Sequence, residues 1–247
     1  MNLLIFGAQG YALGAYQAIK TLYPKRTISC FIVSECGYNA ETLAGIPVRQ
    51  ISNISEAEKR EAQVIIATPE NVQPGIEETL ERYGFHSYSR LTSERWNELM
   101  KLYHIKLGQF LPLSALPVGC NKPFVRVYMA KSHLDRTLRK RVDSPDYVFP
   151  IQVGRANADR TIADIVDNTG DNISERNGNY SEMTGLYWIW KNKLEKGSDD
   201  SSYYGFGQYR RMLEFSTDDL LRLSDNDVDA VLPYPMPYEP NIHAHHE

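Results

Sequence analysis

The chain has 247 residues, a formal net charge of −4 and an isoelectric point near 5.9, and 42% of its residues are hydrophobic. A chain of this length can bury the core of one large domain or two smaller ones. The charge excludes the overall basic field typical of nucleic-acid-binding proteins, and no apolar run is long enough to cross a bilayer.

The N-terminus and the cysteines indicate a cytoplasmic protein. Met1–Phe6 lacks a basic flank and runs directly into a glycine turn, so it is interpreted as a strand and not as a signal peptide. Cys30, Cys36 and Cys120 lack metal-ligand spacing, and we interpret them as reduced thiols.

The first segment predicts a strand, a glycine turn and a helix. Leu3–Phe6 is apolar, a turn follows at 7–10, and residues to Ile19 have helical spacing. Glycines in such a turn can bring backbone N–H groups to a phosphate, although GxxGxxxG differs from the GxGxxG dinucleotide pattern. A second strand, Ile28–Val33, is followed by an acid where such folds grip a ribose. The candidate nucleotide-binding residues are Gly7, Gly10, Gly14 and Glu35. The alternative is that the glycines serve only the turn and close packing.

Alternation of strands and helices continues to residue 105. A third strand is predicted at 63–67, a helix through Tyr83, and a helix over 93–103. This order predicts an α/β fold with a parallel sheet. We predict a Rossmann-like domain at 1–105, a proline-containing linker at 106–122 and a second α/β domain at 123–247. The first domain resembles the N-terminal Rossmann-like domain of bacterial polysaccharide-assembly proteins, including sugar acyltransferases.

The second domain is predicted to alternate in the same way. Strands are expected at 124–130, 147–154, 203–211 and 229–233. Between them, the polar bend 167–172 is followed by Ser174 as a helix N-cap. Helical spacing of Met183, Leu186, Tyr187 and Trp190 predicts the buried face of an aromatic helix, and we expect Trp188 and Trp190 in the core.

Four blocks in this half carry a specific resemblance. They are Ile151–Gly154, DNTGDNIS at 167–174, the stretch from Asn177 to Asn192 that ends in GLYWIWKN, and YGFGQYRR at 204–211. In order and spacing they are similar to a bacterial glycosyltransferase family of capsular and exopolysaccharide loci. That family is catalogued as a domain of unknown function and includes galactofuranosyltransferases. The similarity runs from Phe124 to the end, about half of the chain.

The resemblance implies a hexosyltransferase with a GT-A-like α/β fold that moves a sugar from a UDP-sugar to a glycan or lipid-linked acceptor. Two features depart from the family. Gln208 stands where the family usually has His, and an amide cannot act as a base. The family domain also continues beyond the position of Glu247, so we expect a truncated or incomplete catalytic domain.

Transfer from a nucleotide sugar requires a base for the acceptor hydroxyl and cations for the departing diphosphate. The candidate catalytic residues are Asp167, Asp171 and Glu182; for each, capping and turn formation is the alternative. Side chains of neighbouring strand residues diverge, so one arginine of the Arg210–Arg211 pair is expected to face the site. The candidate donor-binding residues are Gly154, Asn168, Thr169, Asn172, Tyr209, Arg210 and Arg211.

The sequence leaves the metal dependence of the site open. Mg²⁺ or Mn²⁺ is often held by Asp-x-Asp after a strand in related folds, but the acidic stretch Asp225–Asp229 precedes its predicted strand and is interpreted as a solvated loop. Because Tyr209–Arg211 stands where related folds have the Asp-x-Asp, we expect a metal-independent site and name no metal ligand. The run His243, His245, His246 and Glu247 is interpreted as a frayed end.

Three classes of function remain in view. The first is the glycosyltransferase, acting in the cytoplasm and in peripheral contact with the inner face of the membrane where acceptors are lipid-linked. The second is a non-catalytic nucleotide- or sugar-binding scaffold of a polysaccharide assembly system, and the third is an NAD-dependent oxidoreductase. The basic run from Lys131 to Arg141, with Arg136, Arg139 and Lys140, is interpreted as a solvated helix face, with a phosphate or membrane contact as the alternative.

Overall fold

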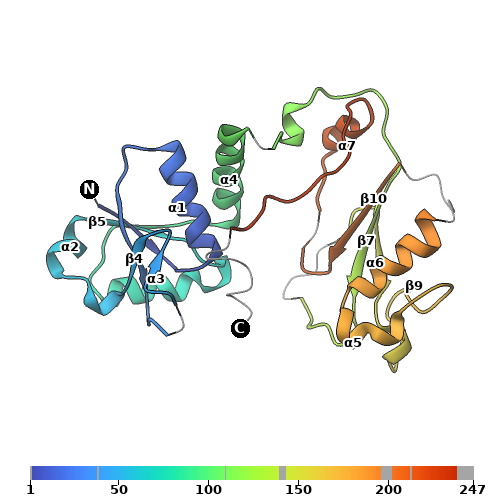
Figure 1. Cartoon of the computed structure of the whole chain (residues 1–247), viewed down its shortest axis with the longest axis horizontal. Helices are drawn as coiled ribbons and strands as arrows, with labels where there is room; N and C mark the ends of the chain where they lie inside the picture. Colours follow the sequence, from blue (N-terminus) through green and yellow to red (C-terminus); the bar gives the residue numbers. More distant parts are fainter. Residues whose placement is uncertain are drawn as a thin grey trace. The chain divides into compact units, whose positions relative to one another are not determined.

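The structure is a computed structural model that describes residues 2–37, 39–108, 110–138, 143–195, 202–211 and 213–237. It divides into two compact units (Figure 1). Unit 1 comprises Met1–Pro112 and Val231–Glu247, and unit 2 comprises Leu113–Ala230. The chain therefore leaves unit 1, forms unit 2 and returns to unit 1. This return differs from the predicted division, which gave everything after residue 122 to one domain.

Unit 1 has a six-stranded sheet in the order β3-β4-β2-β1-β5-β6, parallel except for the β3–β4 hairpin. Its strands are β1 (Asn2–Phe6), β2 (Ile28–Val33), β3 (Thr42–Leu43), β4 (Ile46–Gln50), β5 (Ala62–Ile66) and β6 (Tyr88–Arg90). Its helices are α1 (Gly10–Leu22), α2 (Glu56–Glu61), α3 (Gln73–Arg82) and α4 (Ser93–Leu107). The parallel part has the strand order of a Rossmann fold, with the switch point between β1 and β5. The predicted α/β class is confirmed.

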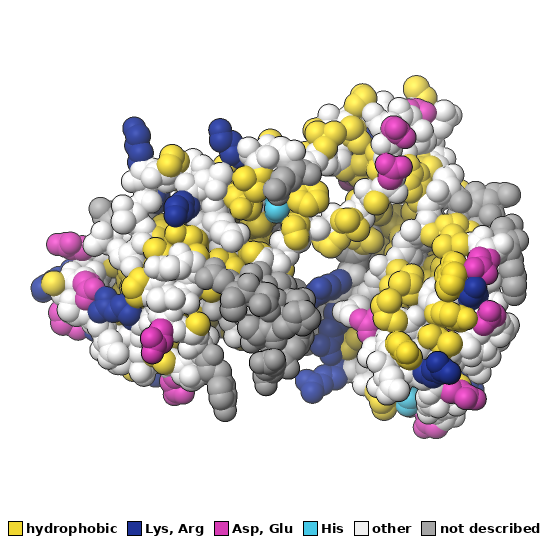
Figure 2. All heavy atoms as spheres, viewed as in Figure 1, with side chains coloured by type: hydrophobic (Ala, Val, Ile, Leu, Met, Phe, Trp, Pro, Cys, Tyr) yellow, Lys and Arg dark blue, Asp and Glu magenta, His cyan; other side chains and the backbone are white. Residues whose placement is uncertain are grey.

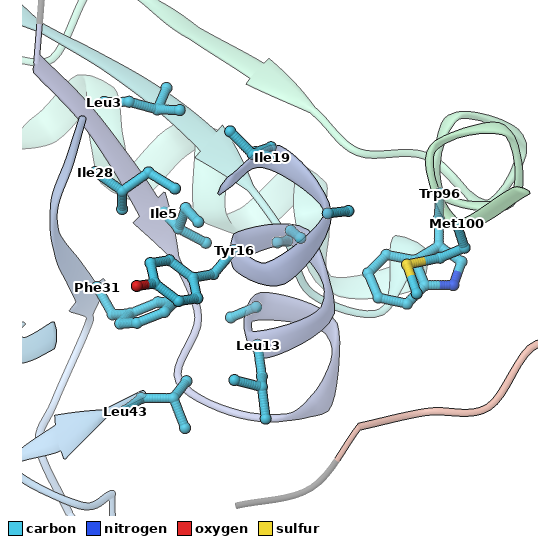
Figure 3. Packing of buried hydrophobic residues seen from close by; sticks show 14 residues of the cluster. Leu3, Ile5, Leu13, Tyr16, Ile19, Ile28, Phe31, Leu43, Trp96 and Met100 are labelled. Carbon is cyan, nitrogen blue, oxygen red and sulfur yellow. The ribbon is translucent and has the colours of Figure 1, made fainter. Parts of the chain in front are cut away.

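Alternate residues of β1 supply two separate cores because successive strand side chains point to opposite faces. Leu3 and Ile5 pack with α1 and α4, including Trp96 (Figure 3). Leu4 and Phe6 pack on the other face with residues of α3 and the segments around it. The sheet is thus covered by helices on both sides, as the uninterrupted apolar run of β1 requires.

Two glycines of the first segment are explained by packing. A Cβ on Gly7, which has φ +122°, would lie 2.7 Å from the carbonyl oxygen of Ala67. A Cβ on Gly14 would lie 2.4 Å from the indole ring of Trp96, where α1 crosses α4. Both positions therefore need glycine whether or not a nucleotide binds.

Gly14→Ala is expected to lower the free energy of unfolding of unit 1 by about 1–3 kcal/mol, because the added methyl overpacks the contact between α1 and α4. The matched control is Gly75→Ala in α3, where a Cβ meets nothing within 4 Å; helix propensity predicts a gain of about 0.5–1 kcal/mol there. Chemical denaturation of both variants measures the difference, and equal stabilities would contradict the proposed contact.

The return segment, residues 231–237, is irregular, so the strand predicted at 229–233 is wrong. Tyr234 and Met236 pack against the core cluster of α1 and α4. Leu232, in contrast, is 72% exposed. The residues that suggested a strand therefore belong to an irregular segment, and Tyr234 and Met236, which follow them, are the residues that pack on the core of unit 1.

Unit 2 has a four-stranded parallel sheet in the order β10-β7-β8-β9. The strands are β7 (Val125–Lys131), β8 (Val148–Gln152), β9 (Ile165–Val166) and β10 (Tyr203–Gln208). The helices are α5 (Asn177–Tyr180), α6 (Met183–Ile189), which continues as a π-helix over Trp190–Leu194, and α7 (Thr217–Ser224). Because all four strands are parallel, their carboxyl ends meet at one edge of the sheet.

Helix α6 presents a different face to the core from the one predicted. Its buried residues are Thr184, Gly185, Trp188 and Ile189, and Trp188 packs on Tyr128 of β7. Met183, Leu186 and Trp190 are 51%, 38% and 46% exposed, and Figure 2 shows hydrophobic side chains at the surface over this helix. The prediction was correct for Trp188 and wrong for the Met183–Trp190 face.

Candidate functional site

A pocket of about 350 Å³ lies at the carboxyl edge of the unit 2 sheet. Residues that end or follow β7, β8 and β10 line it together with the loop before α6. They are Ala130, Lys131, Ser132, Asp135, Val153, Asn177, Ser181, Glu182, Gln208, Tyr209 and Arg210. We call this the carboxyl-edge pocket. Parallel α/β sheets bind their ligands at this edge.

One carboxylate and one amide face each other in this pocket. The Gln208 Nε2 donates a hydrogen bond to Oε1 of Glu182, which lies 26 residues away in the sequence. Glu182 is half-buried at the start of α6, and Gln208 ends β10. The amide cannot take a proton, so in this pair it orients the carboxylate and leaves its second oxygen for another partner.

The two neighbouring arginines are placed differently. Arg210 lines the pocket, donates from Nε to the Tyr209 hydroxyl at 2.7 Å and lies over the Tyr209 ring at 5.0 Å. Arg211 is exposed and does not line the pocket. One of the two arginines therefore lines the pocket; the strand predicted to reach Arg211 ends at Gln208, so both arginines lie in the turn after β10 and strand geometry does not place them.

Asp167 is buried and fully hydrogen-bonded, so it cannot contact a substrate directly. Its side chain has 0% exposure and accepts bonds from the backbone N–H of Gly154 and Arg155 at 2.8 and 3.0 Å. The hydroxyls of Ser174 and Thr184 donate to it at 2.6 and 2.7 Å. The carboxylate thereby joins the ends of β8 and β9 to α6. This corrects the predicted catalytic role to a positioning one.

Ser174 has a different role from the predicted N-cap as well. Its hydroxyl donates to Asp167 and accepts from the backbone N–H of Ala156 at 3.0 Å. No side chain caps the short helical turn that begins at this residue. The serine is therefore a buried link between two loops.

The rest of the polar bend turns away from the carboxyl-edge pocket. Thr169 accepts from the Trp188 indole N–H through its carbonyl oxygen at 2.9 Å, and Asn172 bonds back to Gly170. Asp171 is exposed and accepts from the Tyr187 hydroxyl at 3.1 Å. Asn168 is exposed, and neither it nor these residues line the pocket. The polar bend and Arg210 therefore do not line the same pocket; of the three predicted acids, only Glu182 lines it with Arg210.

Asn177 and Ser181 are among the pocket residues that were not identified from the sequence. Asn177 donates to the Ser181 carbonyl oxygen at 2.6 Å and to the Thr184 hydroxyl at 3.1 Å. Those bonds hold Ser181 at φ +48°, a backbone conformation that non-glycine residues rarely adopt and that is often found at functional sites. Gly154 is buried beneath Asn177, whose side chain would lie 2.6 Å from a Cβ there. The predicted donor contact at Gly154 is thus replaced by a packing role.

A second hollow of about 520 Å³ adjoins the carboxyl-edge pocket and shares Lys131, Ser132, Asp135 and Tyr209 with it. Arg136, Arg160 and His133 also line it, and Asp135 bonds the backbone N–H of Ser132 at 2.8 Å. Figure 2 shows Lys and Arg side chains gathered on unit 2. Arg136 is thus part of a pocket wall and not of a helix face; Arg139, Lys140 and Arg141 lie outside the described residues.

A larger hollow of about 1050 Å³ lies at the opposite, amino end of β7 and β10. The stretch Asp225–Asp229 lies in a turn and loop, as predicted, and Asp225, Asp227 and Asp229 line this hollow. Asp225 accepts from the Cys120 backbone N–H at 2.5 Å, and this bond holds the pKa of the carboxyl below its usual value. We favour the smaller pocket as the site because ligands of parallel α/β folds bind at the carboxyl ends of strands.

In unit 1, the candidate nucleotide-binding residues do not form an open site. Gly7 and Gly14 pack as described above, and a Cβ on Gly10 would lie 2.8 Å from Met236 Cγ of the return segment. Glu35 follows β2 and is exposed. The turn geometry predicted from the sequence is present, but the chain itself fills the space beside Gly10.

The described part of the chain contains no group of three or more His, Cys, Asp or Glu side chains arranged to hold a metal ion. His243, His245, His246 and Glu247 are outside it. None of its helices combines the length and apolarity needed to cross a membrane.

Comparisons with known proteins find similarity mainly in unit 2. A family model described as "Domain of unknown function (DUF4422)" matches residues 132–235, which include every residue that lines the carboxyl-edge pocket except Ala130 and Lys131. No curated protein matches the chain. Among solved structures, the apo structure of the WbbM bifunctional glycosyltransferase is similar, with 35% identity and a TM-score of 0.28. That match covers 35% of this chain and 13% of the solved chain.

Proposed function

We propose that unit 2 belongs to a glycosyltransferase that moves a sugar from a UDP-sugar to a glycan or lipid-linked acceptor in surface-polysaccharide synthesis. The observation that carries the proposal is the meeting of Glu182 and Arg210 in one pocket at the carboxyl edge. A carboxylate and a guanidinium are the two charges that transfer from a nucleotide sugar needs. Three of the four sequence blocks of the family resemblance, all except the bend at 167–174, contribute residues to this pocket.

Each charge has a defined task in the proposed reaction. Glu182 accepts the proton of the acceptor hydroxyl as that oxygen bonds to the anomeric carbon. Arg210 stabilises the negative charge of the nucleoside diphosphate as the sugar–phosphate bond breaks. Gln208 keeps the Glu182 carboxylate oriented through its hydrogen bond. Asp167 holds the loop that carries Gly154 against helix α6, which carries Thr184.

A panel of UDP-sugars tests donor binding by thermal protection of the intact chain. At least one donor is expected to raise the melting temperature, and Arg210→Ala is expected to weaken its binding about 10–100-fold because a charge-assisted hydrogen bond is lost. Arg211→Ala is the matched control and retains binding, since Arg211 does not line the pocket. Equal loss in both variants, or protection by NAD(H) alone, would contradict the proposal.

A non-catalytic donor-binding protein is the second candidate, and Gln208 favours it. The amide occupies the position of the family's usual His and engages one oxygen of Glu182. A scaffold of this kind binds the donor with the same dependence on Arg210 but releases no UDP in the presence of acceptor. Measurement of UDP release beside donor binding therefore separates the two candidates.

A further inference from the structure

The return segment covers a surface of unit 1 that includes the N-terminus of α1, beside the switch point of the sheet, and we call this covered surface the groove. In a Rossmann fold this is the place of the ligand's pyrophosphate. Here the return segment fills it. A Cβ on Gly10 would lie 2.8 Å from Met236 Cγ, 3.0 Å from its sulfur and 3.2 Å from the carbonyl oxygen of Pro237. The absence of a side chain at Gly10 is therefore what admits Met236.

Aromatic rings line this groove. The Tyr234 ring stacks on His104 with centroids 5.2 Å apart and planes 6° apart. His104 also contacts Tyr103 and Phe110, at 5.1 and 5.0 Å between ring centroids. It is 4% exposed, neither of its ring nitrogens has a hydrogen-bond partner among the described residues, and burial lowers its pKa. His104 thus acts as a neutral, flat surface for the tyrosine ring.

The segment itself has the composition of a peptide suited to such a groove. Residues 232–237 read LPYPMP, with proline at 233, 235 and 237. Proline fixes φ and carries no backbone N–H, so the segment loses little conformational entropy on binding and leaves few donors unpaired. Aromatic grooves that bind extended proline-rich peptides use the same physical advantages.

We propose that unit 1 has a binding site for an extended peptide with alternating prolines, and that the chain's own residues 233–237 occupy it in place of a nucleotide. The site involves only unit 1, so it is independent of the function proposed for unit 2. Tyr234 and Met236 are its two anchors.

Hydrogen exchange of the full chain tests the docking. In the Tyr234→Ala/Met236→Ala variant, amides of α1 and of the last turn of α4 are expected to exchange roughly tenfold faster, because the covering side chains are lost. Leu232→Ala is the matched control and leaves exchange unchanged, since Leu232 is exposed. Amide exchange in strands β7 and β8, which belong to unit 2, is expected to stay unchanged in both variants. Unaltered exchange in the double variant, or an equal effect of Leu232→Ala, would overturn the docking.

A synthetic peptide of residues 231–237 tests whether the groove is a binding site. Millimolar peptide is needed, because it must match the effective concentration of the tethered segment. It is expected to restore slow exchange in the double variant, whereas a peptide with Tyr and Met replaced by Ala is not. No restoration would overturn the binding-site assignment. NAD⁺ serves as a probe that carries a pyrophosphate. If NAD⁺ slows the exchange of amides 7–13 in the unchanged chain, the binding-site assignment is also overturned.

Discussion

Asp167→Ala is expected to lower the free energy of unfolding of unit 2 by about 3–5 kcal/mol, the largest stability effect in this unit. The substitution leaves two backbone N–H groups, of Gly154 and Arg155, buried or half-buried without their acceptor. The Ser174 and Thr184 hydroxyls lose their acceptor as well. Chemical denaturation followed by tryptophan fluorescence measures the change, because Trp188 and Trp190 report unit 2.

Asp167→Asn separates hydrogen bonding from shape. The amide keeps the volume of the side chain, but its nitrogen cannot accept from a backbone N–H, so a loss of about 2–3 kcal/mol is expected. Asp171→Asn is the matched control, and its cost is below about 0.5 kcal/mol because Asp171 is exposed. A stability of Asp167→Asn equal to that of the unchanged chain would show that the carboxylate does not hold these loops.

Glu182→Gln is expected to lower the rate of UDP release in the presence of acceptor about 10²–10⁴-fold, because an amide cannot accept the acceptor's proton. The substitution preserves shape, so donor binding is expected to change little. Steady-state assays with the donor found by thermal protection give kcat and KM separately. A loss of kcat with unchanged donor binding is expected if Glu182 is the base. A purely structural role of this side chain would not produce that combination.

The same Asp171→Asn variant serves as the activity control, since that carboxylate lies outside the carboxyl-edge pocket. It is expected to retain turnover. If Glu182→Gln keeps full activity while Asp171→Asn loses it, the base lies in the polar bend and the assignment of the pocket is wrong.

The fold could be predicted from the sequence where strands are apolar and glycine turns follow them. Leu3–Phe6 is buried on both faces, so the run itself identifies a central parallel strand. Strands β3, β4, β6 and β9 were missed; β3, β6 and β9 have only two, three and two residues, too few for a periodic pattern. The carboxyl edge was predictable because each strand is followed by polar residues.

The burial of individual side chains could not be predicted in the same way. Helix α6 is apolar on more than one side, and spacing alone could not tell the Trp188 face from the Met183–Trp190 face. Asp167 and Asp171 are the same residue type, and Asp167 is inaccessible because the loop after β8, Ser174 and helix α6 enclose its side chain. Glu182 and Arg210, both named from the sequence, lie at element ends and line the pocket, and their roles in binding or catalysis stay predictions.

The inserted position of unit 2 has a consequence for synthesis on the ribosome. Residues 2–108 contain every strand and helix that the structure describes in unit 1, yet Tyr234 and Met236, which pack on His104 and the N-terminus of α1, are made only after unit 2. At ordinary translation rates this delay is on the order of ten seconds. During that interval the nascent unit 1 exposes His104 and the neighbouring rings to other polypeptides. These rings are covered only after Tyr234 and Met236 have been translated.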